Sequence, residues 1–218
     1  MLEPHRSGGR AIAPSLFAFA VLYGGMTCIA GVLGNKQVDL GPLAVEAGIF
    51  PFLLLVSLSS TVAELHGRDI ANRLVLFGFV PLVLSILLTL LVLSLPAAEE
   101  MEPARRDGFQ LVLGQSPRLM VAGIIAYGIS TFLNVTIFSR MRGAEGRRLL
   151  WLRAGVASML SQIVDTLLFV TIAFLGVFPI AELLIGQMLA KVVLSAVMVP
   201  AVIYLLVAIG RRLDGAPA

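Results

Sequence analysis

This 218-residue chain has very few of the residues that build disulfides and metal centres. It contains one cysteine, Cys28, and two histidines, His5 and His66. A single cysteine cannot form an internal disulfide, and no cysteine and histidine residues occur together with the spacing of a zinc site. We therefore predict that the protein binds no metal ion and needs no cofactor.

Catalytic motifs are missing as well. The sequence has no G-x-x-x-x-G-K-[ST] phosphate-binding loop, no G-x-S-x-G nucleophile elbow and no H-E-x-x-H zinc helix. The loops expected to face the cytoplasm also carry no paired acidic motif that could act through carboxylates alone. These absences exclude ATP hydrolysis by the P-loop route, and we predict that the protein is not an enzyme.

Charged residues are few, and long apolar runs make up most of the sequence. Charged residues make up 13% of the chain, hydrophobic residues make up 58%, and the mean hydropathy is +0.97. A helix that crosses a bilayer needs about 20 apolar residues. Six runs of that kind cover residues 12–33, 43–63, 74–96, 119–138, 149–177 and 181–209. We predict an all-α polytopic membrane protein with six transmembrane helices, forming a single membrane domain over residues 1–218.

The longest loop, residues 96–118, mixes prolines with acidic and basic residues. This composition is typical of a solvated connector. Its hydrophobic piece, residues 109–113, is too short to span a membrane, and we expect it to form a short interfacial segment.

The basic residues are distributed unevenly between the two sides of the predicted membrane. With the amino terminus inside, eleven lie on the cytoplasmic side, namely Arg6, Arg10, Arg68, Arg73, Arg140, Arg142, Arg147, Arg148, Arg153, Arg211 and Arg212. The opposite side holds four, namely Lys36, Arg105, Arg106 and Arg118. Because positive residues stay inside, we predict cytoplasmic termini in a bacterial inner membrane. Basic residues in short loops beside membrane helices also explain the pI of about 9.5 without a nucleic-acid partner.

Two of the predicted helices carry matching polar stripes. Residues 127–138 and 157–169 align at an offset of 31 positions, which pairs Ser130 with Ser161 and Asn134 with Asp165. Positions i, i+4 and i+8 share one face of a helix. We therefore expect Asn134 and Asp165 to face a common cavity. The alternative is that the stripe residues only join helices, each contributing about 0.6 kcal/mol.

Asp165 and Lys191 lie deep inside predicted spans. A carboxylate such as Asp165 costs several kcal/mol in a membrane unless it is paired or hydrated, so by default it marks a site or a pathway. Lys191, inside the sixth span, raises the same question. Either the two form one buried ion pair that holds helices together, or they line a polar cavity.

Glu64 and His66 end the second predicted span. His66 precedes Gly67, a candidate helix C-cap, and we interpret His66 as a capping or interfacial residue. Glu64 is less easily explained, because a negative charge at a helix C-terminus opposes the helix dipole. We expect another group to stabilise it, either Arg68 or a ligand.

Several blocks of the chain resemble one family. They include "AELHGRDIANRLVLFGF", "VLGQSPRLMVAGIIAY" and, most specifically, "LLWLRAGVASMLSQIVDTLLFVTIAFLGV". These blocks are similar to the queuosine precursor transporters, also called the vitamin-uptake-like integral membrane family. The resemblance implies an inner-membrane protein of six helices, similar to the substrate-binding subunits of energy-coupling-factor transporters, that imports 7-cyano-7-deazaguanine and 7-aminomethyl-7-deazaguanine.

The resemblance also implies a set of substrate-binding residues. The Ser-Gln-x-x-Asp-Thr motif is intact from Ser161 and Gln162 to Asp165, and Glu64 and Lys191 match other family positions. Elsewhere the sequence departs from the family pattern, at Ser59, Ser60, His66, Thr131 and Asn134. Because of these departures, the resemblance does not fix the substrate. The alternative is that the chain is a divergent paralogue that imports another small polar solute.

A mechanism follows from the chemistry of a deazaguanine. Its ring N–H and exocyclic amine are parallel donors that the carboxylate of Asp165 or Glu64 could accept. Gln162 and Asn134 could bind the carbonyl and ring nitrogens, and Tyr127 could stack on the ring. The alternative function is a non-transporting scaffold or accessory subunit. The sequence does not decide how transport is powered, whether a partner ATPase takes part, or whether the protein forms homo-oligomers.

Overall fold

The computed structural model describes residues 12–40, 43–114, 117–141, 149–176 and 181–215. Within these residues the chain forms seven helices and one antiparallel hairpin. The elements in chain order are α1 (Pro14–Leu33), β1 (Gln37–Leu40), β2 (Leu43–Glu46), α2 (Ile49–His66), α3 (Arg68–Ser94), α4 (Pro103–Leu113), α5 (Pro117–Arg140), α6 (Leu150–Phe174) and α7 (Ala181–Leu213).

Six of these helices are long and apolar enough to cross a membrane, counted over the described residues. They are α1, α2, α3, α5, α6 and α7, so the prediction of an all-α polytopic membrane protein is confirmed. The seventh, α4, includes the segment expected at residues 109–113 and extends it to 11 residues.

The second span begins later than its apolar run. Leu43–Glu46 forms strand β2, in which Val45 lies opposite Val38 of β1. The helix starts only at Ile49. Hydrophobicity alone placed its start at residue 43, because a short apolar run does not distinguish a strand from a helix.

A glycine separates α2 from α3. Gly67 has a φ of 93°, a left-handed conformation that only glycine adopts easily, so the α2 helix ends there as expected. The third helix then begins directly at Arg68, six residues before the apolar run at residue 74. Its first turns are polar, which kept them out of the hydrophobic pattern.

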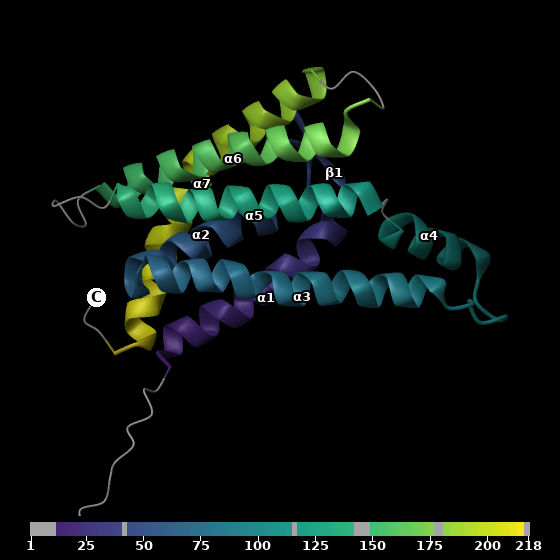
Figure 1. Ribbon diagram of the computed structural model, residues 1–218, viewed down its shortest axis with the longest axis horizontal. Helices are drawn as coiled ribbons and strands as arrows, with labels where there is room; N and C mark the ends of the chain where they lie inside the picture. The colour runs from purple at the N-terminus through teal and green to yellow at the C-terminus, as the bar shows by residue number, and fades with distance from the viewer. Residues whose placement is uncertain (1–11, 41–42, 115–116, 142–148, 177–180, 216–218) are drawn as a thin grey trace, which may run out of the picture.

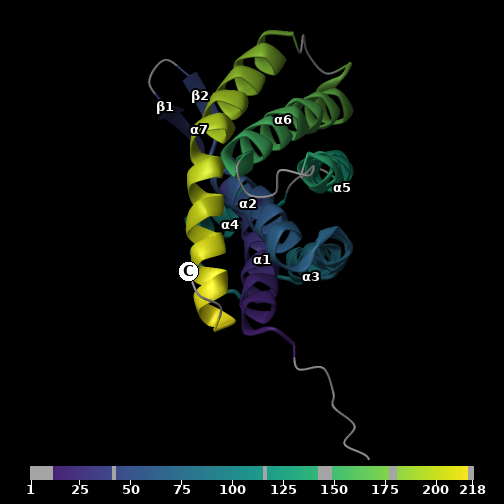
Figure 2. The same ribbon diagram turned by 90° about the vertical axis from the view of Figure 1, so that its left-hand side faces the viewer.

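Helices α3 and α5 run along the long axis of the molecule (Figure 1), whereas the second half of α7 runs across it (Figure 2). Helix α4 lies at one end, with the hairpin on the same side of the centre, whereas α1 begins and α7 finishes at the other end. We call the first end the hairpin end. Figure 2 shows α7 changing direction along its length, and Pro200 inside the helix accounts for this, since proline removes one backbone hydrogen bond.

Helix α2 lies at the centre of the bundle. Of its most apolar 18-residue window, 72% is buried, compared with 11% for α3. The buried face carries small hydroxyl residues, and Ser57 and Ser59 donate to backbone carbonyls of the preceding turn. Small side chains whose hydroxyl groups are hydrogen-bonded within their own helix let neighbouring helices pack closely.

Candidate functional site

A cavity of about 500 Å³ lies in the half of the bundle nearer the hairpin end. Most of its wall is apolar and comes from α1, α2, α3, α4 and α5. The polar and aromatic side chains that line it are Thr27, Asn35, Glu46, Phe52, Ser85, Thr89, Tyr127, Asp165, Phe169 and Lys191. A small number of polar groups in an apolar cavity of this size is typical of a small-molecule site.

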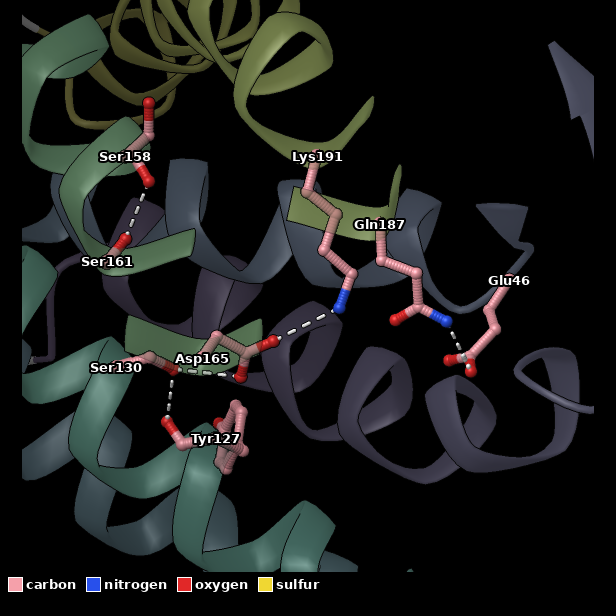
Figure 3. Close-up of polar contacts among 8 residues, drawn as sticks. All are labelled: Glu46, Tyr127, Ser130, Ser158, Ser161, Asp165, Gln187 and Lys191. Carbon is pink, nitrogen blue, oxygen red and sulfur yellow. Dashed lines mark hydrogen bonds and ion pairs between the residues drawn. The ribbon is translucent and has the colours of Figure 1, made fainter. Parts of the chain in front are cut away.

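Asp165 and Lys191 form an ion pair on the cavity wall. Lys191 Nζ lies 3.3 Å from Asp165 Oδ2, and Ser130 Oγ donates to the other carboxylate oxygen at 3.2 Å (Figure 3). The pair therefore joins α6 to α7 and also lines the cavity, whose wall is otherwise mostly apolar. Side by side, a carboxylate and an ammonium group present an acceptor and a donor to whatever enters.

Tyr127 of α5 is held in place at the cavity. Its hydroxyl donates to the Tyr23 hydroxyl of α1. The ring lies edge-on to Phe79, with centroids 5.2 Å apart, and to Phe52, with centroids 6.4 Å apart. These contacts fix the Tyr127 ring at the cavity wall.

A second polar pair adjoins the cavity, and the sequence did not point to it. Glu46, the last residue of β2, lines the cavity, and Gln187 Nε2 donates to its carboxylate at 3.2 Å. Gln187 lies one helical turn before Lys191 on α7, so i, i+4 spacing could have suggested it. Glu46 also falls inside the run predicted to be the second transmembrane helix, so the rule that marked Asp165 and Lys191 could have marked Glu46 as well.

Glu64 does not line the cavity. It is buried near the end of α2, where Arg153 Nη2 of α6 donates to its carboxylate at 2.9 Å. The Arg153 guanidinium also lies 4.3 Å from the centre of the Phe138 ring. Arg68, the expected partner, instead donates to Thr136. Arg153, counted above with the cytoplasmic positive charges, is thus an interior residue.

Asn134 does not share the cavity with Asp165, so that prediction is wrong. Its amide points to α2 and donates to Ser60 Oγ at 2.9 Å. The residue of α5 that meets Asp165 is Ser130, one turn earlier. The 31-residue repeat located polar faces on both helices correctly, but the rotation of each helix depends on its own neighbours, and α5 also packs against α2.

Ser161 and Gln162 are fully buried and do not line the cavity. Ser161 donates to the Ser158 carbonyl at 2.9 Å. Neither amide atom of Gln162 has a hydrogen-bond partner among the described residues. Of the Ser-Gln-x-x-Asp-Thr motif, therefore, only Asp165 lines the cavity, and its other polar members are buried elsewhere in the bundle.

Three helix ends meet at the opposite end of the bundle from the hairpin. Asp214, just after α7, accepts hydrogen bonds from the backbone N–H and hydroxyl of Ser15 at 2.9 and 2.6 Å. His66 Nε2 lies 2.8 Å from the same hydroxyl. Slight burial opposes ionisation of Asp214, but the Ser15 hydrogen bonds and the nearby His66 outweigh it and lower the pKa of Asp214. His66 therefore lies at a helix junction, as expected of an end residue.

Comparison with known proteins identifies the family. The profile of the family described as "Putative vitamin uptake transporter" matches residues 46–205, about three quarters of the chain. The chain belongs to this vitamin uptake transporter family. It is similar to the "Probable queuosine precursor transporter" of Bacillus subtilis (strain 168), with 28% identity over 185 residues that cover 83% of this chain and 80% of the relative.

Membership of the vitamin uptake transporter family makes the protein a membrane transporter, a class that moves a solute rather than transforming it. No solved structure matches this chain significantly. The expected similarity to substrate-binding subunits of energy-coupling-factor transporters therefore stays a prediction. The family match begins at Glu46 and includes all of α2, α3, α5 and α6, which carry much of the cavity wall.

Proposed function

We propose that this chain imports the queuosine precursors 7-cyano-7-deazaguanine and 7-aminomethyl-7-deazaguanine across a bacterial inner membrane. The name of the Bacillus relative supports the substrate class. The observation that carries the proposal for this chain is the Asp165–Lys191 pair on the wall of the cavity.

The pair matches the hydrogen-bonding edge of a deazaguanine. Along that edge the base presents an exocyclic amine, a ring N–H and then a carbonyl oxygen. A carboxylate accepts from two parallel donors, and an ammonium group donates to a carbonyl. Asp165 takes the first role and Lys191 the second. In the low dielectric of a membrane interior, such charge-assisted bonds are stronger than they would be in water.

Aromatic side chains bind the flat ring. Tyr127, Phe52 and Phe169 all line the cavity, and offset or edge-on contacts between rings contribute about 0.5–1.5 kcal/mol each. Ser161, Gln162, Asn134 and Glu64, which were candidates for direct contact, do not line the cavity. Their role in this proposal is to set the positions of α2, α5 and α6.

The position of the cavity agrees with import. With cytoplasmic termini, the hairpin end faces outward, because α1 begins and α7 finishes at the other end. The cavity lies in that outward half. A solute would enter from the outside, and the Glu64–Arg153 pair lies farther along the bundle toward the cytoplasm.

Uptake by cells that can neither make nor import queuosine precursors tests the proposal. Such cells receive a labelled deazaguanine, with this protein or with the Asp165→Asn variant at equal membrane level. We expect saturable accumulation with the wild-type protein and loss of it with the variant. Absence of accumulation with well-expressed wild-type protein would contradict the proposal and favour a scaffold or a different solute.

A further inference from the structure

The charges on the cavity wall do not cancel. Among the described residues, the carboxylate and ammonium side chains that line the cavity are Glu46, Asp165 and Lys191. Lys191 pairs with Asp165 at 3.3 Å, whereas the hydrogen-bond partner of Glu46 is the neutral amide of Gln187. Two carboxylates and one ammonium group leave one negative charge uncompensated. A charge in an apolar surrounding is costly unless an opposite charge reaches it.

Glu46 is partly buried and is positioned by two elements. It is the last residue of β2, whose register is set by the pairing of Gln37 with Glu46 and of Val38 with Val45. From the other side, the buried Gln187 donates to its carboxylate. A carboxylate fixed by two elements in this way is a preorganised acceptor.

The polar groups of the wall lie in a row. Figure 3 shows Asp165, Lys191, Gln187 and Glu46 in succession, and Lys191 and Gln187 are one helical turn apart on α7. The edge of a deazaguanine has a matching order: amine and ring N–H, then the carbonyl oxygen, then the substituent on carbon 7. With the donors on Asp165 and the carbonyl on Lys191, the substituent is directed toward Glu46.

We infer that Glu46 is an ammonium-binding subsite, positioned by Gln187, that makes the transporter prefer a cationic 7-substituent over a neutral one. This inference rests on the proposed function. The aminomethyl precursor carries a primary ammonium group at neutral pH and compensates the Glu46 charge. The cyano precursor is neutral, and its nitrile nitrogen is an acceptor that a carboxylate repels.

The test is the ratio of aminomethyl to cyano uptake, measured for both labelled precursors in cells unable to make or import them. Loss of one charge-assisted contact lowers affinity by about tenfold or more. We therefore expect Glu46→Gln to lower the ratio by about tenfold and Glu46→Asp to retain most of it. General damage to the protein would lower both uptakes and leave the ratio constant.

A second variant tests the inference if the Glu46→Gln protein does not reach the membrane. Gln187→Lys places an ammonium group beside Glu46 and should lower the same ratio. An unchanged ratio in the variants would overturn the inference, and so would a wild-type protein that imports the cyano precursor alone. The latter result leaves the proposed function intact, whereas a wild-type protein that imports neither precursor contradicts both proposals.

Discussion

At the scale of single residues, Asp165 has two roles that an experiment can separate. It pairs with Lys191, and it lines the cavity. Asp165→Asn removes an ionised acceptor, and loss of a hydrogen bond to a charged group costs about 1.5–3 kcal/mol. We expect a roughly ten- to hundredfold weaker affinity for a deazaguanine, measured as the concentration for half-maximal uptake.

The double variant Asp165→Asn/Lys191→Met distinguishes the two roles. The single variant leaves a buried ammonium group unpaired, and breaking a buried pair in this way costs about 3–5 kcal/mol of stability. We expect the double variant to regain thermal stability in detergent without regaining uptake. Recovery of uptake would show that the pair only joins α6 to α7.

At the scale of elements, close packing of α3 against α1 depends on Gly78. A methyl group on Gly78 would lie 2.5 Å from Cε1 of Tyr23 and 3.3 Å from the Tyr127 hydroxyl. Overpacking of this kind costs about 1–3 kcal/mol. We expect Gly78→Ala to lower the melting temperature and to weaken uptake through the displaced Tyr127. Gly25→Ala is the matched control, since no atom lies within 4 Å of its added methyl group; equal melting temperatures would refute the packing argument.

The ends of α1 and α7 are joined by Asp214, and this contact depends on pH. The pKa of Asp214 in the folded protein is lowered from its ordinary value of 3.8. Its contribution is therefore present above that value and is lost as the pH falls through the lower folded pKa. We expect thermal stability in detergent to fall less steeply below about pH 4 for Asp214→Asn than for the wild type. Parallel pH profiles would show that the carboxylate does not stabilise the junction.

At the scale of the whole molecule, orientation in the membrane decides which way the cavity opens. The predicted orientation rests on eleven basic residues, and five of them lie outside the described residues, namely Arg6, Arg10, Arg142, Arg147 and Arg148. In a Cys28→Ser background, we expect an impermeant thiol reagent to label Asp39→Cys on the hairpin of intact cells. Arg212→Cys, beyond the bend of α7, should stay unlabelled until the cells are opened. The reverse pattern would place the termini outside.

Much of this protein is determined by its sequence alone. Six long helices follow from apolar runs, because in a bilayer a chain must satisfy its backbone hydrogen bonds within each span. Asp165 and Lys191 were found because charge is rare and costly in such helices. The break at Gly67 followed from the conformational freedom of glycine.

Only the tertiary structure decided which polar residues meet. Asn134 and Asp165 occupy equivalent positions in a repeat, yet Asn134 binds α2 and Ser130 takes the place beside Asp165. Glu64 forms an ion pair with Arg153, 89 residues away in sequence, rather than with nearby Arg68. Glu46 reached the cavity through a hairpin that resembled the start of a helix. Periodicity gives the face of a helix to within a turn, but the rotation of that face and its partners are set by packing between elements distant in sequence.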